Sequence, residues 1–260
     1  MNTTRSLSKS ELVTRSLSQM ERELHAEPLT LRQKLALTCR VLFDGGHDSG
    51  LAGQITARMN NQDQFLTQPF GTGFDEITEE NLLVVDHDLR TVDGSGMPNP
   101  ANRFHTWIYD ARPDVNCIIH THPSHVSALS MLEVPLTISH MDTCPLYDDC
   151  AFLADWPGVP VGNEEGEIIS RALGKKRAIL LSHHGMLVAG TTVEEACVVA
   201  LLMERAARMQ LLAMAAGTVK EIPAALGREA HDWILTPKRS SVTFAYFARR
   251  ALRTHIDCLS

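Results

Sequence analysis

Short apolar runs of strand length recur along the chain, and polar or glycine-bearing loops separate them. Runs of this length, bounded by turn residues, are typical of buried strands. They predict strands over residues 54–59, 64–67, 82–86, 115–119, 177–181 and 186–189, and a further strand followed by a loop within 135–147.

Longer segments repeat apolar residues at helical spacing. One opens after Thr30 and ends at Gly45, and the longest has a capping-box sequence at Thr192 and Glu195 and ends near Gly217. Further helices are expected over 103–111, from 124, over 163–173 and over 244–253. Because strand runs lie between helices, the pattern predicts an α/β protein with a mixed sheet in three layers.

The same pattern suggests three parts. Residues 1–27 are polar and rich in serine, so we expect a flexible N-terminal arm with at most a short helix. Residues 28–217 form the expected domain, and residues 218–260 an extension that packs on this domain or on a neighbouring subunit. A chain of 260 residues, 44% hydrophobic, can bury one sizeable core, and no Gly/Ser-rich or Pro-rich linker divides it.

Composition disfavours several classes of partner. A net charge of −7 and only 5% aromatic residues argue against nucleic-acid binding, which needs clustered basic and stacking side chains. No signal peptide and no apolar stretch of membrane-spanning length is found, so no membrane partner is expected. The six cysteines lack Cys-x-x-Cys spacing, which favours reduced thiols and a cytoplasmic location.

Histidines end two of the predicted strands. His120 and His122 are two residues apart at the end of an apolar run, so their side chains point to the same face. The chain has 12 histidines, and such a pair is more often a surface or core feature than a ligand pair. A second apolar run, however, ends in Ser182-His183-His184-Gly185. Three histidines from two strand ends match a catalytic zinc site with one open position.

The order of short motifs resembles the class II aldolase/adducin family over about residues 29–217. The motifs are Gly50-x-Ala52-Gly53-Gln54, Pro69-Phe70-Gly71, Arg103-Phe104-His105 with Arg112-Pro113-Asp114, His120-Thr121-His122 and His183-His184-Gly185. The resemblance implies a three-layer α/β/α fold with a central mixed, largely antiparallel sheet, and a homotetramer with sites between subunits. It places the metal ligands at His120, His122 and His184, leaves His183 as a neighbour that is not a ligand, and places substrate contacts at Gln54, Gly71 and Asn102.

Four changes separate this chain from the aldolase pattern. Ala101 stands where the family's catalytic Glu is expected, and Asn99-Pro100 replaces the Ser-Ser pair that grips phosphate. Phe70 replaces a small hydroxyl residue, and Gln54 replaces the Asn that closes the first glycine loop. A base for carbon deprotonation is typically worth about 10²–10⁴ in rate, and phosphate needs hydrogen-bond donors. The departures therefore argue against a sugar-phosphate aldolase.

The first functional hypothesis is a divalent-metal-dependent carbon–carbon lyase, of decarboxylase or aldolase type, for a small hydroxy or keto acid or hydroxyketone. The metal, zinc first with manganese or iron as alternatives, would stabilise the charge that develops when the bond breaks. Decarboxylation needs that electron sink more than it needs a base. Arg103 is the candidate for carboxylate recognition and His105 for proton transfer, although both are as often packing or surface residues on a helix.

Two other hypotheses stay open. A non-heme iron oxygenase could use the same three histidines, although the common iron triad is two His and one carboxylate. An adducin-like binding module would keep the fold without catalysis, but such modules tend to lose the ligand histidines that this chain retains. Metal content separates the module from the enzymes, and oxygen consumption separates the two enzymes.

Overall fold

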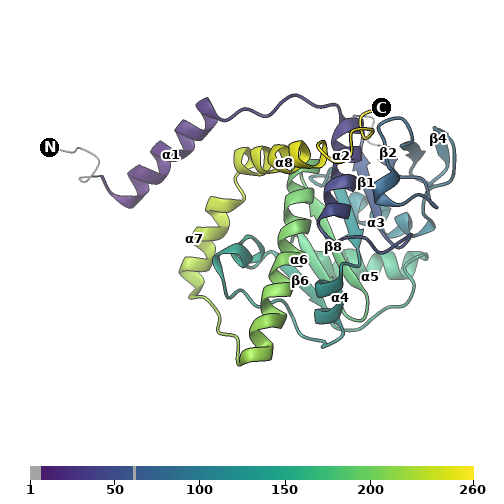
Figure 1. The fold of residues 1–260 in the computed structure, drawn as a ribbon. Helices are drawn as coiled ribbons and strands as arrows, with labels where there is room; N and C mark the ends of the chain where they lie inside the picture. The colour runs from purple at the N-terminus through teal and green to yellow at the C-terminus, as the bar shows by residue number, and fades with distance from the viewer. Residues whose placement is uncertain (1–6, 61–62) are drawn as a thin grey trace.

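One mixed sheet forms the centre of the molecule (Figure 1). The computed structural model describes residues 7–60 and 63–260. Within these ranges eight strands pair antiparallel, except for one parallel pair, β6 with β7. The mixed, largely antiparallel sheet confirms the predicted fold class. Across the sheet the strands are β4 (Thr91–Asp93), β3 (Leu83–Asp86), β2 (Gln64–Thr67), β1 (Gln54–Arg58), β5 (Cys117–Thr121), β8 (Gly185–Gly190), β7 (Ala178–Leu181) and β6 (Cys150–Leu153).

Helices cover both faces of the sheet and make the three layers. One face carries α2 (Leu31–Asp44), α4 (Ser124–Ser130), α6 (Val193–Ala216) and α8 (Pro237–Ala251), and the other carries α3 (Arg103–Ala111) and α5 (Asn163–Leu173). In β5, Cys117 and Ile119 belong to the first core and Ile118 to the second. Because successive side chains alternate between two covered faces, every residue of this strand is buried, including the polar His120 and Thr121 at its end.

The pairing register brings the ends of several strands together at one end of the sheet. His120 of β5 lies between Gln54 of β1 and Leu187 of β8. Leu181, the last residue of β7, pairs with Gly185 of β8 and runs parallel to the end of β6. The ends of β5, β6 and β7 therefore meet the beginnings of β1 and β8. Both predicted histidine motifs lie at this end of the sheet.

Most predicted elements are confirmed, and α3 and α5 span the predicted ranges. The strand expected within 135–147 is wrong, because the chain there forms a 3₁₀ helix, η4 (Met141–Leu146), that contains Pro145. A proline lacks the N–H that a strand inside a sheet must donate. The strand lies later, as β6. The sequence also missed β4 and α7 (Ala224–Ile234), while the remaining short 3₁₀ helices are η2 (Phe74–Glu76) and η3 (Pro100–Asn102).

The capping box predicted for α6 is half formed. Thr192 accepts a hydrogen bond from the Glu195 backbone N–H at 3.1 Å, as expected of an N-cap. The Glu195 carboxylate, however, accepts from Thr191 and Arg177 instead of closing the box. The Glu195 carboxylate therefore bonds to residues outside α6 instead of capping the start of that helix.

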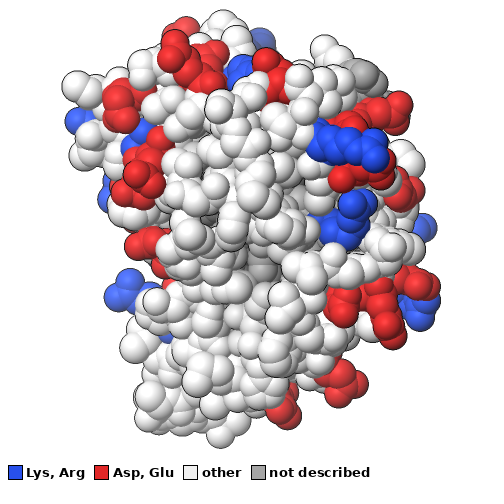
Figure 2. Space-filling model, turned by 90° about the vertical axis from the view of Figure 1, so that its right-hand side faces the viewer, with Lys and Arg blue, Asp and Glu red and all other residues white. Residues whose placement is uncertain are grey.

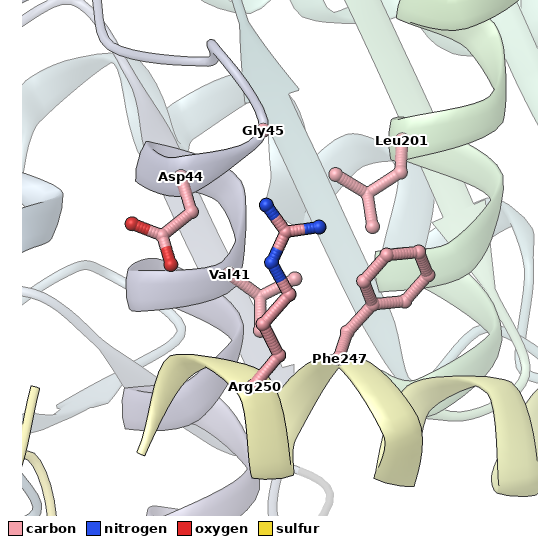
Figure 3. A pocket seen from close by; sticks show the side chains of 6 residues that line it. All are labelled: Val41, Asp44, Gly45, Leu201, Phe247 and Arg250. Atoms are coloured by element: carbon pink, nitrogen blue, oxygen red, sulfur yellow. The ribbon is translucent and has the colours of Figure 1, made fainter. Parts of the chain in front are cut away.

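The C-terminal extension packs on the same domain. Helix α8 lies across α2 and α6, and Figure 3 shows Phe247 and Arg250 of α8 beside Val41 and Leu201. The cavity that remains between these helices has a volume of about 50 Å³. By the same measure one water molecule needs roughly 10–15 Å³, so this space has room for a few water molecules.

Further contacts hold the end of the chain. The buried Arg40 donates to Asp257 at 2.7 Å, His255 Nε2 contacts Asp44 at 2.9 Å, and Glu79 N–H donates to the Cys258 carbonyl at 2.9 Å. These bonds join the last residues to α2 and to the loop before β3.

The N-terminal segment contains a helix of its own, α1 (Lys9–Glu23). A capping box at Ser8 and Glu11 begins it, and none of its residues is buried. Lys9 forms an ion pair with Glu229 of α7, but most of α1 stands away from the sheet (Figure 1). Residues 1–6 of the expected flexible arm lie outside the described residues, and the flexibility of the arm stays a prediction.

The described helices and one view of the surface add two observations. No helix over the described residues combines the length and hydropathy needed to cross a membrane. On the face in Figure 2, Lys and Arg side chains lie in small groups beside acidic ones, and uncharged residues form the centre. This face presents mixed charge rather than a continuous basic surface.

Candidate metal centre

His120 and His122 converge at the end of β5. His120 lies inside the strand and is buried, whereas His122 follows the last strand residue and is partly exposed. Their Nε2 atoms lie 2.9 Å apart and their ring centroids 4.8 Å apart. The spacing of two residues therefore brings both imidazoles to one point, as the sequence predicted.

His184 completes the cluster from the turn between β7 and β8. Its ring centroid lies 4.8 Å from that of His120 and 4.6 Å from that of His122. One nitrogen of each ring lies within 4.8 Å of the others. The preceding His183 has a φ of 55° and contacts Glu133 at 2.7 Å, so it faces away from the cluster.

The three rings are neutral near pH 7. Burial lowers the pKa of His120 well below its ordinary value, and the neighbouring His184 and His122 add to that effect. Burial also lowers the pKa of His122, and burial together with His122 lowers that of His184 to about 4. Neutral imidazoles bind divalent cations, at roughly 2.0–2.1 Å for zinc. In a tetrahedral site this length separates two nitrogens by about 3.3 Å. The His120 and His122 nitrogens, 2.9 Å apart, are already near that separation, and all three ligand nitrogens lie within 4.8 Å of one another.

Close packing fixes the backbone beneath the cluster. A Cβ on Gly185 would lie 2.6 Å from both His122 Cδ2 and the Thr121 carbonyl oxygen, so only glycine fits there. The Thr121 hydroxyl, between the two histidines in sequence, lies 2.8 Å from Nδ1 of the buried His47. The Phe104 ring of α3 packs edge-on against His120 at 5.1 Å. The glycine of the His-His-Gly motif is thus required by the approach of two strands.

Several buried polar atoms near the cluster have no hydrogen-bond partner among the described residues. Buried polar atoms are normally paired, so unpaired ones indicate a missing ligand or water. The Asn102 amide shows which atom is free: Nδ2 donates to Thr67 Oγ1, whose own proton goes to the Ile55 carbonyl, leaving Oδ1 as an unpaired acceptor. The unpaired atoms are His47 Nε2, Gln54 Oε1, Asn102 Oδ1, His105 Nε2 and His120 Nδ1.

The two expected catalytic residues lie in different surroundings. His105 is fully buried, its Nδ1 lies 2.9 Å from the Thr56 hydroxyl, and burial lowers its pKa to about 3. Arg103 is partly exposed and donates to the Asp88 carbonyl at 3.3 Å, in the turn between β3 and β4. No hydrogen bond among the described residues joins Arg103 to the histidine cluster. The catalytic roles of both residues stay predictions.

The loop residues expected at the substrate lie at the ends of β1 and β2. Gln54 is buried opposite His120 in the sheet register, and Gly71 is exposed with a φ of 98°. Phe70 is 43% exposed, and its N–H donates to the Met97 carbonyl at 2.8 Å. Ala101 is buried within η3, so the position of the family's base carries only a methyl group.

Sequence reasoning missed two residues near the cluster. Trp156, in the loop after β6, is 50% exposed and its ring lies 6.5 Å from that of His184. His47, in the loop after α2, is bound to Thr121. The sequence shows Trp156 only as part of a Trp-Pro-Gly turn and His47 only as one of 12 histidines, so neither pattern singles them out.

Known proteins resemble this chain in sequence. It is 35% identical over 209 residues to a Streptomyces niveus protein named Decarboxylase NovR, covering 78% of this chain and 76% of that protein. It is also 35% identical over 209 residues to a protein of Streptomyces roseochromogenus subsp. oscitans named 4-hydroxy-3-prenylphenylpyruvate oxygenase/4-hydroxy-3-prenylbenzoate synthase, covering 78% and 74%.

A solved structure and a family model agree with this likeness. The L-fuculose 1-phosphate aldolase from Glaciozyma antarctica PI12 superposes with a TM-score of 0.82 at 26% identity, covering 94% of this chain and 99% of that one. The sequence model described as Class II Aldolase and Adducin N-terminal domain matches residues 33–211. The chain therefore belongs to the class II aldolase/adducin family.

Proposed function

We propose that this protein is a divalent-metal-dependent carbon–carbon lyase, of decarboxylase or aldolase type, for a small hydroxy or keto acid or hydroxyketone. The observation that carries the proposal is the cluster of His120, His122 and His184, whose ring nitrogens lie within 4.8 Å of one another. No fourth His, Cys, Asp or Glu completes this cluster among the described residues. A cation held there keeps a coordination position for substrate.

The three imidazoles would hold the cation, which we expect to be zinc, with manganese or iron as alternatives. A cation in that position supplies a Lewis acid for a substrate oxygen that gains charge as the carbon–carbon bond breaks. The protein supplies ligand nitrogens that are already neutral and largely shielded from water. Little free energy is therefore needed to deprotonate or desolvate these nitrogens when the cation binds.

The surroundings favour an apolar substrate group over a phosphate. Pro100 has no N–H, Ala101 has no polar side chain, and Phe70 is an exposed aromatic ring. Phosphate recognition depends on N–H groups, hydroxyls or Arg. Trp156 adds a second exposed aromatic ring close to His184. The names of the two Streptomyces relatives, a decarboxylase and an enzyme of a prenylated phenylpyruvate, support a keto acid with an aromatic substituent.

Polar groups near the cluster suit hydroxyl donors. The unpaired oxygens of Gln54 and Asn102 would accept a hydrogen bond from a substrate hydroxyl or from a water molecule that the substrate orders. His105, hydrogen-bonded to Thr56, would pass a proton through its unpaired Nε2. Because Gln54, Asn102 and His105 are buried, these roles require substrate entry to open the layer between β1 and α3.

A non-heme iron oxygenase is the second candidate, because one relative of 35% identity carries an oxygenase name. Three histidines with an open side also suit Fe(II). The two candidates differ in one requirement: an oxygenase consumes molecular oxygen in proportion to product, whereas a lyase releases carbon dioxide or an aldehyde without it.

The protein is also proposed to assemble as a homotetramer. Exposed apolar side chains on the loop after β6, which carries Trp156, Val159 and Val161, favour burial against another copy. Light scattering of the purified protein measures the mass, and a monomer at micromolar concentration would contradict this assembly.

The test is metal analysis of protein purified without added metal, followed by a substrate screen. We expect about one divalent cation per chain, and turnover of an aryl-substituted 2-keto acid but not of fuculose or rhamnulose phosphate. An oxygen electrode run in parallel distinguishes the lyase from the oxygenase. Rapid cleavage of a sugar phosphate would overturn the argument from Phe70, Pro100 and Ala101, and the absence of bound metal would overturn the proposal itself.

A further inference from the structure

The three histidines differ in what holds their backbone. His120 lies inside β5 and is paired on both sides, with Gln54 and with Leu187. His122 follows Thr121, the last residue of β5, so it lies beyond the paired part of the strand. A side chain outside the sheet ladder needs another support if it is to hold a fixed position.

That support begins in α4, which starts two residues after His122. The N-cap of α4 is Pro123, which makes no side-chain capping bond. A helix without a capping side chain leaves its first N–H groups without partners. Here a residue of another helix satisfies them: the Glu204 carboxylate of α6 accepts from the His125 N–H at 3.1 Å and the Val126 N–H at 2.9 Å.

Glu204 makes a third contact to the same turn. Its Oε1 lies 2.5 Å from His125 Nδ1, and its side chain is only 10% exposed. A carboxylate that accepts several hydrogen bonds at a helix N-terminus forms strong, charge-assisted contacts. The residue comes from the middle of α6, 78 and 79 positions along the chain, and α6 also packs against β5 and β8. The start of α4 is thereby fixed to the helix layer beneath the sheet.

We propose that Glu204 is a positioning residue for the metal centre. By holding the first turn of α4 it fixes Pro123, and through Pro123 the backbone of His122. This inference rests on the proposed metal centre, because it concerns the geometry in which His122 reaches the cation. The Glu204 side chain itself acts from the helix layer and touches neither substrate nor metal.

Glu195 provides a matched control on the same helix. It is a buried Glu with hydrogen bonds to Thr191 and Arg177, near the start of α6 and away from the histidines. Glu204→Gln and Glu195→Gln each remove one carboxylate charge from α6 without changing side-chain size. A purely structural role predicts lower thermal stability for both variants and the same metal affinity.

The experiment is titration of the metal-free proteins with Co²⁺, followed by its visible absorption, with the melting temperature of each metal-free protein measured beside it. Loss of a partner that orients a metal ligand typically weakens affinity about 10–100-fold. We expect Glu204→Gln to weaken cobalt binding about 10-fold and Glu195→Gln to stay within about twofold of wild type.

A second variant keeps the test decisive if Glu204→Gln does not fold. Glu204→Asp retains the charge but draws the carboxylate back by one methylene, and should weaken cobalt binding about fivefold. Cobalt affinity within twofold of wild type in a folded Glu204 variant would overturn this inference alone. A wild-type protein that binds no cobalt would instead refute the proposed metal centre, and the inference with it.

Discussion

The two ends of strand β7 carry polar clusters of different kinds. Arg177 precedes the strand and lies in a group with Asp149, Glu195 and His231, in which each charge has a partner. His184 follows the strand and lies with His120 and His122, where the buried His120 Nδ1 has no hydrogen-bond partner among the described residues. The first group is complete within the chain, whereas the second is the group proposed to hold a cation.

Electrostatics follows the same division. At the Arg177 end, the hydrogen bond to Asp149 raises the pKa of His231 against the effect of burial. Burial favours the neutral Asp149 carboxyl, but its bonds to His231 and Arg177 outweigh this and lower its pKa. At the other end, burial alone lowers the pKa of His122 and dominates for His120 and His184. The paired charges at the Arg177 end stabilise the fold, and the neutral rings at the other end are the proposed metal ligands.

The largest expected effect is the loss of metal affinity when a proposed ligand histidine is replaced. His120→Ala and His184→Ala should each lower metal affinity by more than the roughly 10–100-fold that loss of a partner of a metal ligand costs. The metal-free variants should stay within about 1–2 kcal/mol of the wild-type unfolding free energy, since these rings lack strong partners. Metal analysis and urea unfolding measure the two quantities. Full metal content in both variants would refute the triad.

The opposite outcome is expected at the other end of the strand. Arg177→Met should lower the unfolding free energy by about 3 kcal/mol, because it removes the only guanidinium that pairs with both the Asp149 and Glu195 carboxylates among the described residues. Metal content should not change. Arg171→Met is the control, since the exposed pair with Glu167 contributes less than about 0.5 kcal/mol. If Arg177→Met also lost the metal, the two ends would not be independent.

The smallest expected effect is the pH dependence of the stability that His231 contributes at the Arg177 end of β7. The folded-state pKa of His231 is raised, so its contribution is fully present below the ordinary histidine pKa and is lost as pH rises through the folded value. Asp149, Asp232 and Arg177 face its ring. His231→Asn should therefore cost about 1 kcal/mol at pH 6 and less at pH 8.5. Urea unfolding at both pH values measures this, and an equal loss at both would exclude a charged His231.

Local pattern predicted much of the fold. The helical spacing over 103–111 and 163–173 gave α3 and α5 within their observed bounds, since these segments have clear amphipathic periods and end at breaking residues. The sequence did not predict which strands pair with one another, because an apolar run carries no information about its neighbours in the sheet. The strand expected within 135–147 is η4 instead, and the three-residue edge strand β4 has no apolar signal, since all its residues are exposed.

The sequence by itself determined which side chains are candidates for the chemistry. They are two histidines spaced two residues apart at a strand end and a third before a glycine, together with the departures at Phe70 and Ala101. These follow from residue identity and from the two-residue period of a strand. Only the tertiary structure decided that β5, β7 and β8 bring the three rings within 4.8 Å, that His105 is buried, and that Glu204 holds α4. Such relations join residues tens of positions apart, and distance along a chain does not fix distance in space.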